Sequence, residues 1–285
     1  MLVYLDERAD NTSKPKETIA RIARINEHMG SKPISEIRGK TCRDFADHRQ
    51  TEAGARRDLE VLRAAINYYH AEYTLDVVPK VTLPNKSLPR ERWLTRNEVA
   101  ALIRAARNTH RCDHIVRLLL VGIYSGTRLS AMLGLQWMPN TTGGWVDLDA
   151  GVIYRKAIGE RVSHNKRKTP VKIAPRLLRL LKYWKAQDEA FDREAERARP
   201  TLHVINYFGD KVNKPHKAFR AVRAKAKLGN DVTPHVLRHT RATWLANAGV
   251  DVQEAAASLG ITTDEFERTY LHNHPEFQQN AANAY

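Results

Sequence analysis

Hydrophobic positions recur at helical spacing along the first third of the chain. Between residues 53 and 73 the apolar side chains are four or three residues apart, the period of an amphipathic helix. This apolar set is Ala55, Leu59, Leu62, Ile66, Tyr69 and Tyr73. An earlier helix is expected over residues 16–30, and no helix is expected before it. The pattern therefore predicts that the chain begins with a helical region.

A second group of helices is predicted after residue 94. Thr95 and Glu98 have the spacing of a capping box that opens a helix over residues 96–108. Residues 116–126 are almost wholly apolar, which predicts a buried helix that stops at Gly126. A further helix is expected over residues 128–137.

Strand-like segments interrupt this helical pattern only once. They cover residues 145–148, 151–157 and 170–174, and turn or basic loop residues separate them. Residues after 175 return to helical spacing. The predicted fold class is therefore mostly α with a small antiparallel β-sheet, an α+β protein.

A proline-rich basic segment divides the chain. Residues 74–93 contain Pro79, Pro84 and Pro89 among lysines and arginines, which is typical of an extended linker. We therefore predict two domains: a helical domain over residues 1–88, which ends in this linker, and a mixed α and β domain over residues 89–285.

The charge balance indicates a polyanionic partner. The 47 lysines and arginines outnumber the 32 acidic residues and leave a net charge of +15, and nucleic acid is the usual partner of so basic a chain. Cys42 and Cys112 are the two cysteines, so neither a disulfide framework nor a cysteine zinc site is indicated, and a reducing cytosol fits. The start of the chain lacks a signal peptide and no long uncharged apolar run follows, which argues against secretion and membrane insertion.

Basic side chains of the first domain and the linker are candidate DNA contacts. In the helix over residues 53–73 and just before it, arginines recur every seven residues, so they either face a phosphate backbone or form a solvated helix edge. The candidate DNA-binding residues of the helix and the linker are Arg49, Arg56, Arg63, Lys80, Lys86, Arg90 and Arg92.

The segment TPHVLRHT, residues 233–240, concentrates histidine and arginine at a helix start. Thr233 suits the N-cap and Pro234 the first helical position, so His235 would share a face with Arg238 and His239. A zinc site is disfavoured, because the segment lacks a glutamate base and the arginine would place a fixed positive charge beside the metal. Two interpretations stay open: ordinary core-edge and solvent contacts, or a grip on a phosphate.

Three further segments carry residues that suit the phosphate interpretation. Arg128 follows a glycine turn, Lys166 lies in a basic loop before the last predicted strand, His235 and Arg238 form the His-x-x-Arg pair, and Tyr270 lies in the segment EFERTYLHNH. In this order the residues resemble those of the tyrosine recombinase, or phage integrase, family. The resemblance spans most of the chain and implies a helical core-binding domain, a linker and a catalytic domain.

The resemblance implies a metal-independent reaction without a cofactor. Phosphoryl transfer depends mainly on positioning and electrostatics, and arginine suits a phosphate clamp because it stays charged. By resemblance, Arg128 and Arg238 hold the scissile phosphate and Tyr270 forms a 3′-phosphotyrosyl bond. The resemblance assigns base-like work to His235, and it assigns protonation of the leaving 5′-oxygen to Lys166. Lys168 lies close to Lys166 and is an auxiliary candidate.

The chain departs from the family pattern at one position. Ile261, nine residues before Tyr270, stands where the family commonly has a histidine or tryptophan. One hydrogen bond to the phosphate is therefore missing, and His272 or Thr262 could replace it. A catalytically impaired relative of the recombinases thus stays open as an alternative.

A helix-turn-helix regulator is a second alternative. Residues 245–270 have the small-residue spacing and glycine turn of that motif. Charge argues against it, because the second helix would begin with Asp264, Glu265 and Glu267, which phosphates would repel. Thr262 and Glu265 are better explained as a capping box.

The resemblance also implies the partners. They are double-stranded DNA with specific recombination sites, a homotetramer on synapsed DNA, and accessory DNA-bending or directionality proteins. The expected location is the cytoplasm, in the bacterial nucleoid or a phage-infected cell. Because about 15 residues precede the first expected helix, an N-terminal arm-binding domain is not expected. We hypothesise that the tail, residues 273–285, docks on a neighbouring protomer.

Overall fold

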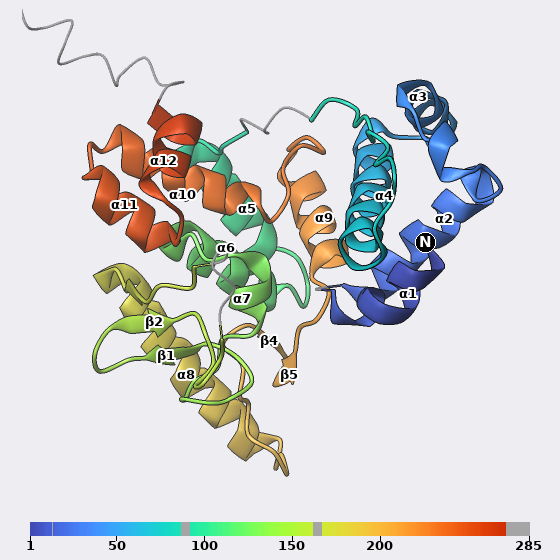
Figure 1. Cartoon of the computed structure of the whole chain (residues 1–285). Coiled ribbons are helices and arrows are strands. Elements are labelled where there is room, and N and C mark those ends of the chain that lie inside the picture. The colour runs from blue at the N-terminus through green and yellow to red at the C-terminus, as the bar shows by residue number, and fades with distance from the viewer. Residues whose placement is uncertain (13, 87–91, 162–166, 272–285) are drawn as a thin grey trace, which may run out of the picture. The chain divides into compact units, whose positions relative to one another are not determined.

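The computed structural model describes residues 1–12, 14–86, 92–161 and 167–271. The chain divides into two compact units, Met1–Arg90 and Glu91–Tyr285, each with its own core (Figure 1).

The first unit is helical. Its elements are α1 (Leu2–Arg8), η1 (Ala9–Asn11), α2 (Pro15–Met29), η2 (Ile34–Glu36), α3 (Gly39–His48) and α4 (Glu52–Tyr73). The predicted helix over residues 53–73 is confirmed as α4. The expectation of no helix before residue 16 is wrong, because α1 precedes it. This helix has no buried residue, and Glu7 ties it to α4 by accepting hydrogen bonds of 2.7 Å from Tyr68 and Tyr73. An apolar period cannot reveal such polar contacts.

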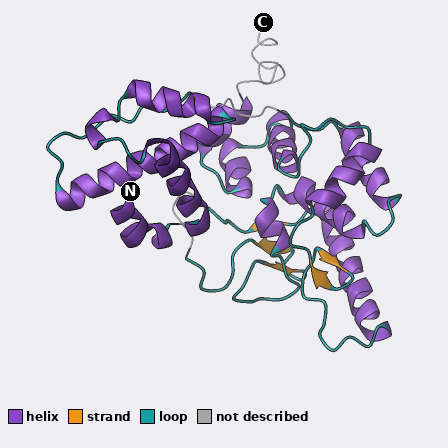
Figure 2. Cartoon of the chain, turned by 90° about the vertical axis from the view of Figure 1, so that its right-hand side faces the viewer, coloured by secondary structure: helices purple, strands orange, loops and turns teal. Residues whose placement is uncertain are grey.

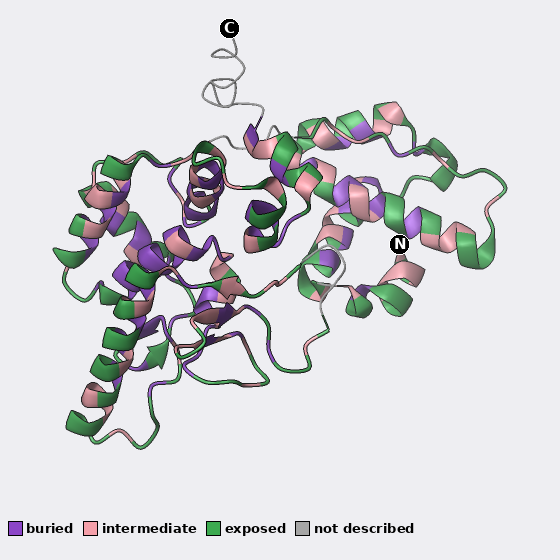
Figure 3. Cartoon of the chain, turned by 90° about the vertical axis from the view of Figure 1, so that its left-hand side faces the viewer, coloured by how far each residue is buried: buried purple, intermediate pink, exposed green. Residues whose placement is uncertain are grey.

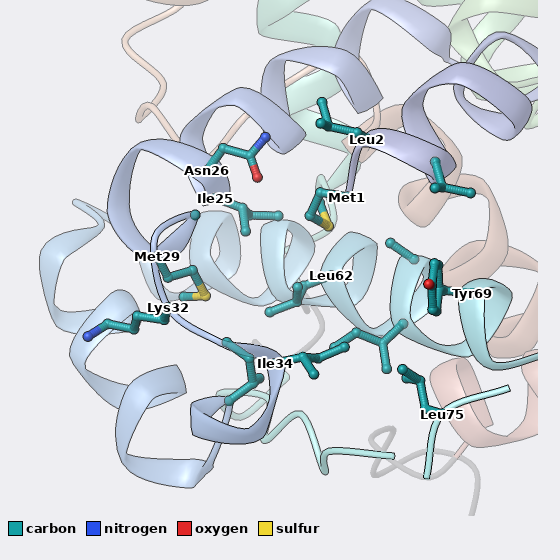
Figure 4. Close-up of a pocket in the computed structure, with 15 residues that line it drawn as sticks. Met1, Leu2, Ile25, Asn26, Met29, Lys32, Ile34, Leu62, Tyr69 and Leu75 are labelled. Carbon is teal, nitrogen blue, oxygen red and sulfur yellow. The ribbon is translucent and has the colours of Figure 1, made fainter. Parts of the chain in front are cut away.

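The core of the first unit lies between α2, α3 and α4. Ile25, Phe45 and Leu59 are fully buried in it. An apolar pocket of about 740 Å³ opens beside this core and is lined by residues such as Met29 and Leu62 (Figure 4). The pocket belongs to the first unit alone.

The second unit begins with the predicted helices. Its helical elements are α5 (Arg96–Arg107), α6 (Asp113–Ser125), α7 (Leu129–Leu133), α8 (Pro175–Glu194), α9 (His216–Lys225), α10 (Val236–Asn247), α11 (Val252–Leu259), α12 (Thr263–Phe266) and a π-helical turn, η3 (Glu267–Leu271). The Thr95–Glu98 capping box of α5 is present. The apolar helix α6 runs through the core and ends at Gly126 in the left-handed conformation, φ +62°.

The predicted antiparallel sheet is confirmed. Strands β1 (Trp145–Asp147), β2 (Val152–Tyr154) and β3 (Val171–Lys172) pair in sequence order. A second, two-stranded sheet of β4 (Asn206–Tyr207) and β5 (Asp210–Lys211) was not predicted. Strands are a small part of the described chain (Figure 2), in agreement with the predicted fold class.

Two helix boundaries differ from the prediction. The helix expected over residues 128–137 ends at Leu133, because Gln136 leaves it and forms isolated bridges with Trp145 and His203. Thr233 is not the N-cap of α10. Its backbone carbonyl instead accepts from Val236 N at 3.0 Å, and His235 takes the cap position.

Several helices change from buried to exposed around their circumference (Figure 3). This is the amphipathic arrangement that the apolar spacing predicts.

Candidate nucleic-acid cleavage site

The turn that carries Arg128 is built around a glycine. Arg128 is the N-cap of α7, and Gly126 and Thr127 separate it from the end of α6. A Cβ on Gly126 would lie 2.5 Å from a methyl carbon of Leu259, so both the positive φ and the close packing require glycine here. The tight turn therefore fixes where the Arg128 side chain begins.

Arg238 holds the same turn from α10. Its side chain is 7 % exposed, and its Nη1 donates to the carbonyl of Gly126 at 2.9 Å. Burial, together with the charge of Arg128, lowers the pKa of Arg238 to about 10. The guanidinium is therefore still charged at neutral pH, and the two arginines of the prediction lie near each other.

A third arginine of this region, Arg155, was not predicted. It follows β2, is 4 % exposed, and donates from Nε to Thr127 Oγ1 at 3.0 Å and from Nη2 to the carbonyl of Ser125 at 2.5 Å. Burial and the charges of Arg238 and Arg128 lower its pKa to about 9. A signal existed in the sequence: Arg155 shares a strand face with the buried Ile153, where a cation is unusual.

Tyr270 lies in the π-helical turn η3, a feature frequent at functional sites. Its hydroxyl is 3.0 Å from Nδ1 of His239, and its ring packs beside Phe266. Burial raises the pKa of the phenol, the charges of Arg238 and Arg128 lower it, and the net shift is upward. The resting side chain is therefore a neutral phenol close to two guanidinium charges.

The contact with His239 was missed by the sequence analysis. Burial and the neighbouring His235 and Arg238 lower the pKa of His239 to about 4, so its imidazole is neutral at physiological pH. His235 is exposed, and its ring lies edge-on to that of His239 with centroids 4.7 Å apart. The Tyr270 contact joins residues 31 positions apart, so no local spacing could have indicated it.

The predicted Lys166 lies outside the described residues. The neighbouring Arg167 offers its carbonyl to Nη1 of Arg128 at 3.4 Å, and Thr169 donates to the carbonyl of Ala257 at 2.6 Å. Lys168, the auxiliary candidate, forms an ion pair with Glu160.

The residues around the departure from the family pattern have structural roles. Ile261 is 7 % exposed and belongs to an apolar cluster with Leu259 and Phe266. Thr262 is exposed and caps α12, because its hydroxyl accepts from the backbone N–H of Glu265 at 3.1 Å. His272 and the tail lie outside the described residues.

The segment of the helix-turn-helix alternative forms α11, a short turn and α12. The second of these helices ends at Phe266 and runs on into the π turn that carries Tyr270, so its acidic start and its tyrosine belong to the candidate site.

The candidate DNA-binding arginines of the first unit differ in availability. Arg63 is exposed. Arg49 instead forms an ion pair of 3.0 Å with the buried Asp58, and Arg56 donates to the carbonyl of Pro84 at 2.5 Å.

The linker candidates also differ. Lys80 and Lys86 are exposed, whereas Arg92 pairs with Glu98 and Asp231. Arg90 lies outside the described residues.

Among the described residues, no three or more histidine, cysteine or acidic side chains gather as a metal cage. Nor does any helix of this part of the chain have the length and apolarity to cross a membrane.

Comparison with known proteins settles the family. The family model described as "Phage integrase family" matches residues 92–276. The chain belongs to the phage integrase family. It is 29% identical to the tyrosine recombinase XerA of Thermococcus kodakarensis over 219 residues, which is 76% of this chain and 71% of the relative. The tyrosine recombinase XerC of Pelotomaculum thermopropionicum is 24% identical over 275 residues, 85% of this chain and 82% of the relative.

Solved structures of two integrases share the fold. A Tn1549 transposon integrase in complex with transposon right end DNA has a TM-score of 0.74 at 15% identity and covers 99% of this chain and 97% of that one. A lambda integrase dimer bound to a COC′ core site has a TM-score of 0.69 at 14% identity, with 96% and 97% covered. Family membership makes the present chain a site-specific DNA recombinase of the tyrosine type.

Proposed function

We propose that the recombinase cleaves DNA by attack of Tyr270 Oη on a scissile phosphate. The new bond joins Oη to phosphorus as the phenolic proton passes to His235, and the bond from phosphorus to the 5′-oxygen breaks. That oxygen takes a proton from Lys166 and leaves as a hydroxyl. Attack by the 5′-hydroxyl of a partner strand on the 3′-phosphotyrosyl bond releases Tyr270 and rejoins the DNA. The reaction conserves the number of phosphodiester bonds and needs no external energy source.

The proximity of Tyr270 to the two arginines carries this proposal. The charges of Arg238 and Arg128 both act on the phenol and lower its pKa, although burial outweighs them and the net shift is upward. These residues come from three segments far apart in sequence. A phosphate between the arginines would lie next to the one side chain of the group that can attack it.

The clustered arginines support anion binding. In the described part of the chain Arg128, Arg155 and Arg238 form no ion pair with a carboxylate, although two of them are buried. Buried charges are ordinarily paired, so an arginine cluster of this kind is suited to an anionic ligand. In our proposal Arg128 and Arg238 grip the non-bridging oxygens of the phosphate.

Lys166 and His235 complete the proposed machinery. Lys166 donates the proton to the leaving 5′-oxygen, and its neighbour Arg167 contacts Arg128 through its carbonyl. His235, at the exposed start of α10, contacts the phosphate and does the base-like work of taking up the phenolic proton. A substrate with sulfur as the 5′-leaving atom separates these roles, because a thiolate departs without a proton. We expect it to restore cleavage by Lys166→Ala and not by Arg238→Ala.

The first domain and the assembly state are also part of the proposal. Residues 1–88 act as the core-binding domain, and the exposed Arg63, Lys80 and Lys86 contact the DNA backbone. Recombination requires two duplexes and four protomers. A lambda integrase tetramer bound to a Holliday junction shares the fold of this chain, at a TM-score of 0.65 and 15% identity, which supports such an assembly.

Trapping of the covalent intermediate tests the proposal. Duplex sites are selected from a random library by binding to the full chain, then nicked near the cleavage position so that the released strand diffuses away. We expect a denaturant-resistant protein–DNA adduct with the wild type and none with Tyr270→Phe. Tyr183→Phe is the matched control, because Tyr183 is an exposed tyrosine of α8. Site-specific binding without an adduct would favour the catalytically impaired relative, and an adduct in Tyr270→Phe would refute the choice of nucleophile.

A further inference from the structure

The histidine beside the nucleophile has no part in the machinery proposed so far. His239 follows Arg238 directly in α10, so one turn of helix presents both the phosphate grip and the imidazole. Its Nδ1 lies 3.0 Å from the hydroxyl of Tyr270, at hydrogen-bond distance. Among the described residues, this is the one hydrogen bond that the Tyr270 hydroxyl forms.

The charges around His239 decide which partner donates. Arg238 is adjacent and His235 contacts the ring edge-on. Protonation of the His239 imidazole beside these groups is therefore disfavoured. Tyr270 is half-buried and keeps its proton at rest. Of the two neutral groups the phenol is the stronger donor and the imidazole lone pair the stronger acceptor. The favoured tautomer therefore carries its ring proton on Nε2, and Nδ1 accepts from the Tyr270 hydroxyl.

This arrangement directs the lone pairs of the nucleophile. When the phenolic hydrogen points at His239, the remaining lone pairs of Oη point away from it and are available for bonding to phosphorus. Phe266 packs against the Tyr270 ring, with centroids 5.5 Å apart, and restricts the rotation of that ring. The hydroxyl is thereby held in one orientation before DNA binds. Holding a nucleophile in its attack geometry in advance accelerates a displacement reaction.

We propose that His239 is a positioning residue for strand cleavage, which accepts a hydrogen bond from the Tyr270 hydroxyl at Nδ1 and orients it toward the phosphate. The inference rests on the proposed role of Tyr270 as the nucleophile. It gives the site a second histidine contact besides that of His235, on the nucleophile rather than on the phosphate.

Three substitutions separate the hydrogen bond from packing. His239→Asn keeps an acceptor oxygen near the position of Nδ1. His239→Leu removes the acceptor at similar volume, and His239→Phe removes it but keeps a ring, so at least one acceptor-free variant is expected to fold. His216→Leu is the matched control, because His216 is an exposed histidine of α9. Thermal unfolding and binding to an intact site confirm that each variant is folded and binds DNA.

The measured quantity is the single-turnover rate of adduct formation at saturating nicked DNA. We expect the leucine and phenylalanine variants to be slower than wild type by about 10- to 100-fold, the usual effect of one misplaced contact at a reacting group. Binding should be unchanged, and the asparagine variant should recover most of the rate. The inference is wrong if an acceptor-free variant cleaves at the wild-type rate, or if the asparagine variant is as slow as the other two.

The Tyr270→Phe experiment keeps the two failures apart. If Tyr270→Phe forms no adduct while the His239 variants cleave at the wild-type rate, only the positioning role of His239 is refuted. If Tyr270→Phe still forms the adduct, the assignment of Tyr270 as the nucleophile is refuted.

Discussion

A buried carboxylate in the first unit allows the stability of that unit to be changed independently of the second unit. The Asp58 side chain is 1 % exposed and accepts two hydrogen bonds from Arg24, at 3.0 and 3.1 Å, while Arg49 pairs with it at 3.0 Å. Asp58→Asn removes the negative charge at nearly constant volume. The arginines then face one another without a counter-charge, and we expect the first unit to lose stability.

The magnitude follows from burial. Breaking a buried ion pair by removing one partner costs roughly 3–5 kcal/mol. The Arg24 and Arg49 side chains are 37% and 26% exposed and can be rehydrated, so the lower end applies. A loss of about 3 kcal/mol, with a urea dependence of about 2 kcal/mol per molar for a unit of this size, lowers the unfolding midpoint by about 1.5 M.

The distribution of tryptophan supplies the assay. All five tryptophans belong to the second unit: Trp93, Trp137, Trp145, Trp184 and Trp244. Tryptophan fluorescence therefore follows the second unit, whereas far-ultraviolet circular dichroism follows the helices of both. In Asp58→Asn we expect part of the dichroism signal to be lost at lower urea, and the fluorescence transition to stay in place.

A surface pair provides the control. Arg56 and Glu60 form a partly exposed ion pair on the same helix, so Glu60→Gln should change the free energy of unfolding by less than about 1 kcal/mol. An unshifted dichroism transition in Asp58→Asn, or an equal shift of both signals, would refute the reasoning.

Three further predictions concern the second unit. Gly126→Ala should lower both the melting temperature and the rate of adduct formation, because its Cβ would meet Leu259 at 2.5 Å in a left-handed turn next to Arg128; normal cleavage would show that the turn adapts. Arg155→Leu should reduce adduct formation at least about tenfold while the chain stays folded by circular dichroism, since the turn loses two hydrogen bonds; an unchanged rate would remove Arg155 from the support of the site. The pKa of His239 falls from 6.5 to about 4 on folding, so the unfolded chain binds a proton more readily and stability is lost as pH falls from about 6.5 to 4. Between these values the wild type should lose up to about 3 kcal/mol more unfolding free energy than His239→Asn in urea titrations, and parallel losses would contradict the assigned shift.

Sequence reasoning succeeded where the determinants are local. The apolar period of α4, the capping box at Thr95 and the glycine stop at Gly126 depend on side chains a few residues apart, and all three are present. The three-stranded sheet was also predicted, because turn residues separate its strands.

Predictions failed where tertiary contacts decide. The helix α1 is held by hydrogen bonds to Glu7 from residues 61 and 66 positions away. The support of Arg128 by Arg155, and the contact of His239 with Tyr270, likewise join distant segments. The cation Arg49, an obvious candidate for DNA, is engaged by Asp58, whose burial only the fold reveals.

The hydrogen bond from Arg238 to the carbonyl of Gly126 also has a consequence for the order of assembly. It links residues 112 positions apart, and Arg155 reaches the same turn from 30 positions away. Contacts of long sequence separation form late, because the intervening chain must first be organised. We therefore expect a partly synthesised or partly folded chain to bind DNA through its basic side chains without being able to nick it. The arginines that hold the phosphate and the nucleophile reach their positions only when the whole second unit has folded.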